Sequence, residues 1–256
     1  MLPADFPIDM YPIMMIVGIV ISFVYMEIYF HKLNIKKGIA TFIEIQVTIS
    51  ALFGVLFAIL FQNLYDYIES PSSYSWSWGM TFYGGIIGGV GSFFILYFSY
   101  FKKKYSSTVL KALEIVAPAG ITVAHGIGRI GCLLDGCCYG LPTDSPLGIK
   151  FSTTATKVWP TNLFECLFLL IFSVVLLFLA LKKNSRLCFP LYMLGYGAWR
   201  FGIEYLRGDD RGSFIPGLTP SQFWSVLLFI AGIGLLIYVL KTPDKKLAVE
   251  KLPHNS

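Results

Sequence analysis

Long apolar runs recur along this chain, and they constrain its fold more than any other feature. The hydrocarbon core of a bilayer is about 30 Å thick, and about 20 helical residues cross it. The composition agrees, because 55% of the residues are hydrophobic and only 14% are charged. Backbone groups inside a bilayer must be paired internally, and no ten-residue alternation typical of a barrel is present. We therefore predict an all-α integral membrane protein with seven transmembrane helices, over residues 11–30, 42–65, 80–101, 108–135, 161–181, 187–206 and 220–240.

The first ten residues, MLPADFPIDM, are unlike a cleavable secretory signal. They carry two acidic residues and no basic residue ahead of the first apolar run, whereas a signal begins with positive charge. The net charge of +5 does not indicate a nucleic-acid partner, because the basic residues form short clusters between apolar runs. We expect one polytopic membrane domain over residues 1–256.

The distribution of lysine and arginine predicts the orientation. Thirteen of them follow the first, third, fifth and seventh runs, whereas the alternate loops hold four. The positive-inside rule then places the amino terminus outside and residues 241–256 in a cytoplasmic tail. The loops at 66–79 and 136–160 consequently face outward. Their tryptophans and tyrosines are typical of interfacial anchors, and a lid over a site is the alternative interpretation.

Ionisable residues inside the predicted helices indicate a functional site, since each costs about 3 kcal/mol at mid-bilayer. Arg129, Glu165, Arg200 and Glu204 all approach the outer ends of their helices. His125, Arg129 and Cys132 share one helical face by their spacing, as do Arg200, Glu204 and Arg207. Two such faces predict a pocket for an anion with an apolar end, such as a phospholipid headgroup. Two structural alternatives stay open: Arg200 and Glu204 as an internal ion pair, and His125 as a hydrogen-bonded core histidine.

Glycines and cysteines are clustered around these runs. The glycines of GMTFYGGIIGGVG and HGIGRIG predict close helix packing, including contact between the third and fourth helices. Cys132, Cys137 and Cys138 fit no common zinc spacing, and we expect that adjacent cysteines do not both point at one ion. A disulfide and a thiol that takes part in group transfer are the alternatives. We expect no metal ion and no cofactor.

Five segments resemble the prolipoprotein diacylglyceryl transferase family, in the family's order and over most of the chain. They are GMTFYGGIIGG, GIGRIGCLLDGCCYG, WPTNLFECL, YGAWRFGIEYLRGD and TPSQFWSVLLFIAG. The arginine–glycine motif of the second segment is the most specific. The resemblance implies a multi-pass enzyme of the bacterial cytoplasmic (plasma) membrane with an outward-facing site.

The resemblance also implies the reaction. A diacylglyceryl group passes from phosphatidylglycerol to the thiol of a lipobox cysteine in a preprolipoprotein, and glycerol phosphate is released. By motif position Arg129 and Arg200 hold the phosphate, while Glu165 and Glu204 orient the arginines or help the proton to leave. With His125 these are the candidate catalytic residues. The candidate substrate-binding residues are Tyr11, Tyr83, Arg207, Asn162, Tyr196, Cys132 and Asp135.

Several positions depart from the family's pattern. Tyr83 and Trp159 stand where the family usually has histidine, Cys132 and Cys137 replace an asparagine and a glutamate, and an arginine of the second helix is missing. The phosphate-binding arginines are thus kept, while the groups that handle the proton are altered, and His125 is the candidate substitute base. Two alternatives remain open: a related lipid transferase with another acceptor, and a non-catalytic phospholipid-binding or transport protein.

Overall fold

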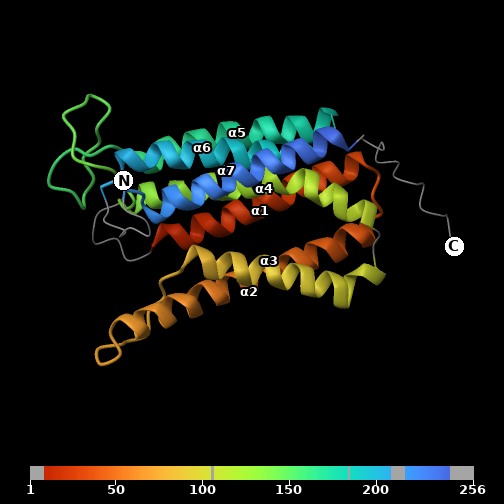
Figure 1. Ribbon diagram of the computed structural model, residues 1–256, viewed down its shortest axis with the longest axis horizontal. Coiled ribbons are helices and arrows are strands. Elements are labelled where there is room, and N and C mark those ends of the chain that lie inside the picture. Colours follow the sequence, from red (N-terminus) through yellow and green to blue (C-terminus); the bar gives the residue numbers. More distant parts are fainter. Residues whose placement is uncertain (1–8, 105–106, 184, 209–216, 243–256) are drawn as a thin grey trace. The chain divides into compact units, whose positions relative to one another are not determined.

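The computed structural model describes residues 9–104, 107–183, 185–208 and 217–242 (Figure 1). Within these ranges the chain forms seven α-helices, two short 3-10 helices and only isolated β-bridges, so the all-α prediction is confirmed for this part of the chain. The α-helices are α1 (Met10–Lys32), α2 (Lys37–Glu69), α3 (Phe82–Ser99), α4 (Ser107–Leu134), α5 (Thr161–Lys183), α6 (Cys188–Ile203) and α7 (Pro220–Lys241). The 3-10 helices are η1 (Phe101–Lys103) and η2 (Glu204–Leu206).

Five of the described helices are long and apolar enough to cross a membrane. They are α1, α5, α7 and the segments Lys37–Ile68 of α2 and Leu110–Leu134 of α4. The other two are shorter, with 18 residues in α3 and 16 in α6. At 1.5 Å per residue they extend about 27 Å and about 24 Å, slightly less than the hydrocarbon core.

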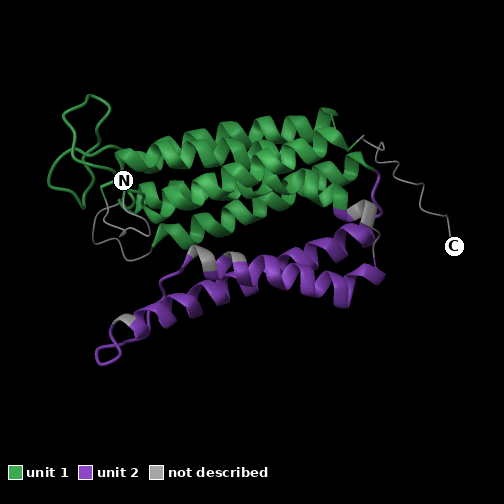
Figure 2. Ribbon diagram, in the orientation of Figure 1, with its two compact units in different colours: residues 1–33, 111–256 green, residues 34–110 purple. Residues whose placement is uncertain are grey.

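The chain divides into two compact units (Figure 2). Residues 1–33 and 111–256 form unit 1, and residues 34–110 form unit 2. Large apolar side chains are exposed along the helices of both units, for example Ile95 of α3 and Ile171 of α5, whereas polar residues such as Gln46 and Glu165 are buried. Apolar side chains outside and polar side chains inside are what a lipid environment favours.

Unit 2 is a hairpin of α2 and α3 that packs through glycines. A Cβ added at Gly84 would lie 2.4 Å from the carbonyl oxygen of Phe57, and one added at Gly88 would lie 2.6 Å from that of Phe53. The glycines of α3 therefore contact α2. Only glycine permits this approach of two backbones.

Unit 1 holds α1 and α4 together by an equally close contact. A Cβ added at Gly131 would lie 2.6 Å from the Cα of Tyr11. Beside it, the carboxylate of Asp135 accepts hydrogen bonds from the backbone N–H groups of Met10 (2.8 Å) and Tyr11 (2.9 Å). These amides have no partner inside their own helix, and a negative charge at a helix N-terminus is favourable.

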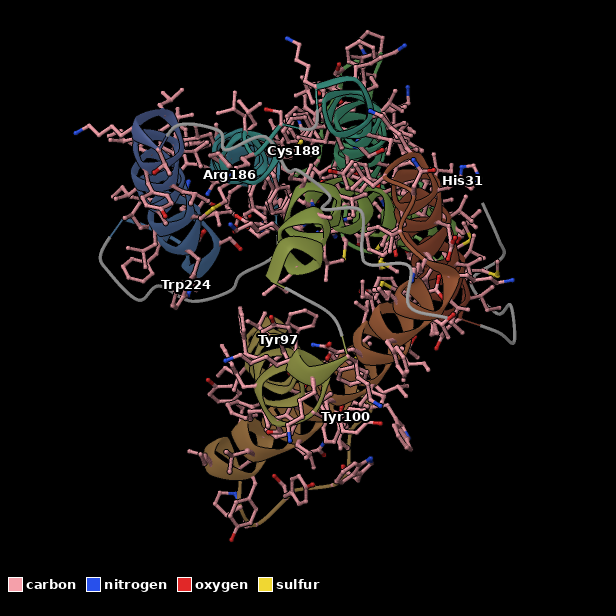
Figure 3. The ribbon with its side chains drawn as sticks, turned by 90° about the vertical axis from the view of Figure 1, so that its right-hand side faces the viewer. His31, Tyr97, Tyr100, Arg186, Cys188 and Trp224 are labelled. Atoms are coloured by element: carbon pink, nitrogen blue, oxygen red, sulfur yellow. The ribbon has the colours of Figure 1, made fainter. Side chains whose placement is uncertain are left out.

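The helices of unit 1 bring the candidate residues to one end. The beginnings of α1, α5 and α7 lie there with the ends of α4 and α6, and the 135–160 loop projects from the same end (Figure 1). Figure 3 views the molecule from the opposite end, where His31, Arg186 and Cys188 are labelled. Arg129, Glu165, Arg200 and Glu204 thus lie in the parts of α4, α5, α6 and η2 that are near this end of unit 1.

Candidate functional site

Glu165 is the centre of a buried polar cluster between α4, α5 and α6. Its side chain is fully buried, and its Oε2 lies 2.9 Å from Nε of Arg129. Nε2 of His125 lies 3.8 Å from Oε1, and the hydroxyl of Tyr196 donates a hydrogen bond of 3.3 Å to the same oxygen. The Tyr196 ring packs edge-on against His125, with ring centroids 5.3 Å apart. Glu165 is therefore the partner that Arg129 needs to be stable inside a membrane protein.

The geometry of the Arg129 side chain leaves part of it available. The contact with Glu165 uses Nε and lacks the alignment of a hydrogen bond. Neither Nη nitrogen forms a hydrogen bond or an ion pair with a described residue, and the side chain is 16% exposed. A guanidinium held at one edge by a carboxylate can present its other edge to a phosphate.

Arg200 is held more tightly than Arg129. Its Nη1 lies 2.6 Å from Oε2 of Glu204, and its Nη2 donates a 2.7 Å hydrogen bond to Oγ of Ser221. Glu204 also accepts a 2.9 Å hydrogen bond from the hydroxyl of Thr219, the residue that caps the N-terminus of α7. The internal Arg200–Glu204 ion pair that the sequence left open is thus present, and it ties the end of α6 to the beginning of α7.

The two ion pairs belong to one electrostatic environment. The charge of Arg200 acts on both His125 and Glu165, and the charge of Arg207 acts on Glu165. The charges of three guanidinium groups, those of Arg129, Arg200 and Arg207, therefore act on Glu165. Several cationic side chains at one site suit an anionic ligand.

The 135–160 loop folds back over the end of the bundle. The N–H of Gly140 donates to the carbonyl of Trp159 (2.7 Å), and the N–H of Leu141 donates to the carbonyl of Leu206 (2.8 Å). A Cβ added at Gly140 would lie 2.1 Å from the Leu206 carbonyl, so only glycine fits. Asn162, a candidate substrate-binding residue, donates to the carbonyl of Cys137 at 2.8 Å and so holds this loop.

The three clustered cysteines lie much closer together than the sequence predicted. The sulfur atoms of Cys132, Cys137 and Cys138 are all within 4.8 Å of one another, and the thiols are free. The expectation that adjacent cysteines diverge is wrong, because Cys138 has a left-handed φ of 56° that turns its side chain back. Hydrogen bonds with the neighbouring thiols lower the pKa of Cys138, and the charges of Arg129 and Arg207 act in the same direction.

The remaining candidates differ in how they relate to the cluster. Tyr11 lies against Gly128 and Gly131 of α4, and its backbone N–H is bound by Asp135. Asp135 therefore positions the beginning of α1, and its role in substrate binding stays a prediction. The side chain of Tyr83 lies outside the described residues.

Three residues near the site were missed. Ser221 accepts a hydrogen bond from Arg200, and Thr219 donates one to Glu204. Both residues lie in TPSQFW, which is part of one of the five segments that resemble the family. The third is Trp199, whose buried Nε1 has no hydrogen-bond partner among the described residues. It borders an apolar groove of about 320 Å³, lined by Phe164, Ala198, Trp199, Gly202, Ile203 and Leu206.

A bundle of membrane-length helices with arginines and carboxylates buried at one end defines a multi-pass membrane protein with a buried polar site. Comparison with known families identifies this chain more narrowly than the class of multi-pass membrane proteins. The chain belongs to the prolipoprotein diacylglyceryl transferase family, whose model matches residues 1–238.

Relatives of known name support this assignment. A phosphatidylglycerol–prolipoprotein diacylglyceryl transferase of Clostridium tetani is 40% identical over 161 residues, which are 60% of this chain and 62% of the relative. The second such transferase of Clostridium perfringens is 37% identical over 68% of this chain and 67% of its own length. One of Francisella tularensis subsp. novicida is 35% identical over 72% of this chain and 70% of its own length. The chain thus matches slightly less than two thirds of the Clostridium tetani relative.

Proposed function

We propose that this chain transfers a diacylglyceryl group from phosphatidylglycerol to the thiol of the lipobox cysteine in a preprolipoprotein, and that glycerol phosphate is released. The observation that carries the proposal is the buried cluster of Arg129, Glu165, Arg200 and Glu204 at one end of unit 1, in which the Nη edge of Arg129 is left for a phosphate. The names of the relatives specify the same donor and acceptor. The proposal includes seven transmembrane helices in a bacterial cytoplasmic membrane, with the site facing outward.

The chemistry requires a base and a cation. The acceptor thiol loses its proton, and the sulfur attacks the carbon of the diacylglyceryl group that carries the phosphate ester. A C–S bond forms as the C–O bond breaks, and the oxygen leaves with the electron pair as glycerol phosphate. Cationic donors placed beside the leaving phosphate stabilise the charge that develops there.

Arg129 is the primary phosphate ligand in this proposal. Its Nε is engaged with Glu165, so the two Nη nitrogens form the edge that a phosphate binds in bidentate fashion. Both Nη nitrogens of Arg200 are already engaged with Glu204 and Ser221. Arg200 therefore adds positive charge and fixes α6 against α7, and the two glutamates are positioning residues.

His125 is the proposed base. Its side chain is 30% exposed, against 16% for Arg129 and 0% for Glu165. Its Nε2 faces Glu165, a carboxylate that stabilises the imidazolium formed when the ring accepts a proton. The apolar groove bordered by Trp199 is the proposed place of a donor acyl chain, because its lining is mostly apolar and Trp199 directly precedes Arg200 in α6.

A turnover assay tests the proposal. Purified protein with phosphatidylglycerol vesicles and a lipobox peptide should release glycerol phosphate, and Arg129→Ala should lower the rate by about 100-fold or more. Arg129→Lys should also be impaired, since a point charge does not form the planar fork. Arg186→Ala, which removes an arginine at the opposite end of unit 1, is the matched control and should keep the rate.

The same assay separates Arg129 from Arg200. Arg200→Ala should lower both the rate and the melting temperature, because it breaks the contact between α6 and α7, whereas Arg129→Ala should lower mainly the rate. Release that persists in Arg129→Ala would remove this residue from the mechanism. Binding of phosphatidylglycerol without turnover, under conditions where a named relative is active, would favour a non-catalytic lipid-binding protein.

A further inference from the structure

Three thiols converge beside the guanidinium cluster, and the proposed transfer leaves them without a role. Cys132 lies in the last turn of α4, and Cys137 and Cys138 follow in the next turn of the chain. Their sulfur atoms are all within 4.8 Å of one another, and none forms a disulfide. Thiolates bound to one Zn²⁺ at about 2.3 Å in tetrahedral geometry lie about 3.8 Å apart. The three sulfur atoms therefore need to move inward only slightly to bind one ion together.

The backbone is shaped for this convergence. Cys138 has a φ of 56°, a left-handed conformation that residues with a side chain rarely adopt. Gly136, two residues earlier, has a φ of 63°, so the turn between α4 and the loop reverses sharply. In an extended chain the side chains of residues 137 and 138 would point to opposite sides. A strained conformation of this kind persists only where the surrounding structure imposes it.

Two buried side chains at the beginning of α5 impose it. The amide of Asn162 donates to the carbonyl oxygens of Cys137 (2.8 Å) and Cys132 (3.4 Å), and the hydroxyl of Thr161 donates to that of Cys138 (3.0 Å). The N–H of Cys137 also donates to the carbonyl of Cys132 at 3.0 Å. Both α5 residues are fully buried. The backbones of all three cysteines are thus held in place by groups that leave the sulfur atoms available.

We propose that Cys132, Cys137 and Cys138 form a binding site for a thiophilic divalent cation, with Zn²⁺ as the probe. Each thiol gives up its proton to solvent on binding, and no oxidant or reductant is needed. The described residues offer three ligand atoms, so the fourth tetrahedral position is open to water or to an added thiol. Three thiolates on a dication carry one net negative charge, and the nearby charges of Arg129 and Arg207 compensate it. This site does not depend on the proposed transferase activity.

Metal binding to the full-length protein tests this site. The metal-free, reduced protein in detergent should bind one Zn²⁺ per chain in competition with a chromophoric chelator. Cys132→Ser, Cys137→Ser and Cys138→Ser should each weaken binding by at least about tenfold, because each removes one of three ligands. Cys166→Ser is the matched control, since Cys166 is a buried cysteine of α5 outside the cluster, and it should bind as the wild type does.

A spectroscopic measurement on the unaltered protein covers the case in which a serine variant does not fold. Co²⁺ in the site should give the near-ultraviolet charge-transfer band of thiolate ligands, and added Zn²⁺ should remove that band and raise the melting temperature. The absence of this band, equal Zn²⁺ binding in all four variants, or no Zn²⁺ binding by the reduced wild type would each overturn the proposal. Isolation with two of the three thiols as a disulfide, and no Zn²⁺ binding after reduction, would instead assign the cluster to redox chemistry.

Discussion

At the scale of single residues, His125 gives the most direct test of how the proposed transfer would activate its acceptor thiol. Glu165, Arg129, Tyr196 and the charge of Arg200 all act on it. A base works only in its neutral form, so the wild-type rate should fall as the pH decreases through the range in which His125 becomes protonated. His125→Gln should lower the rate by about 100-fold and abolish this acid limb.

The measurement is the rate of glycerol phosphate release against pH. His31→Gln is the control, because His31 is exposed at the opposite end of unit 1 and should leave the profile unchanged. An acid limb that is the same in His125→Gln and the wild type would assign the base to another group.

The candidate site shows what can be predicted at this scale. Arg129 has no acidic residue one turn away in the sequence, which indicates a partner on another helix, and the structure shows that this partner is Glu165. The hydrogen bonds of Asp135 to the amides of Met10 and Tyr11 were not predictable, because these residues are more than 120 positions away in the sequence. The convergence of the cysteines depends on one left-handed φ, which residue spacing does not indicate.

At the scale of elements, the hairpin of α2 and α3 should depend on where its glycines lie. A Cβ at Gly88 would be 2.4 Å from Cβ of Phe57, whereas a Cβ at Gly91 would meet nothing within 4 Å. Gly88→Ala should therefore destabilise the protein by about 1–3 kcal/mol, since packed backbones must separate. Gly91→Ala should be neutral or slightly stabilising, because alanine favours helix more than glycine does.

Thermal unfolding in detergent compares the two variants, which carry the same change in the same helix. A lower melting temperature for Gly88→Ala alone is expected. Equal melting temperatures would show that the α2–α3 contact does not have the close approach described above.

Helix positions were the most predictable part of the fold, since each apolar run ends where polar or turn-forming residues begin. The predicted range 161–181 corresponds to Thr161–Lys183, and 220–240 corresponds to Pro220–Lys241. The second predicted range, 42–65, was too short, because α2 continues through polar residues at both ends to Lys37 and Glu69. The partner helix of the α3 glycines was not predictable, because a glycine pattern indicates close helix packing but does not indicate which helix is the partner.

At the scale of the whole molecule, the number of membrane crossings determines the side on which the site opens. Seven crossings with the amino terminus outside place Lys103 in the cytoplasm and Thr156 outside. If the two shorter helices, α3 and α6, did not cross, the positions of Lys103 and Thr156 would be exchanged. The clusters of lysine after α1, α3 and α5 favour seven crossings.

Lys103→Cys and Thr156→Cys each introduce a thiol whose labelling shows on which side of the membrane it lies. Both positions are exposed in the structure, so a reagent can reach them. In intact cells a membrane-impermeant maleimide should label the cysteine at 156, and the cysteine at 103 should react only after permeabilisation. Peptide mapping by mass spectrometry distinguishes these thiols from the native ones. The reverse pattern would turn the 135–160 loop and the adjoining end of unit 1 toward the cytoplasm. The Arg129 cluster would then face the wrong compartment for an acceptor that is modified on the outer side, and the proposed transfer would lose its acceptor.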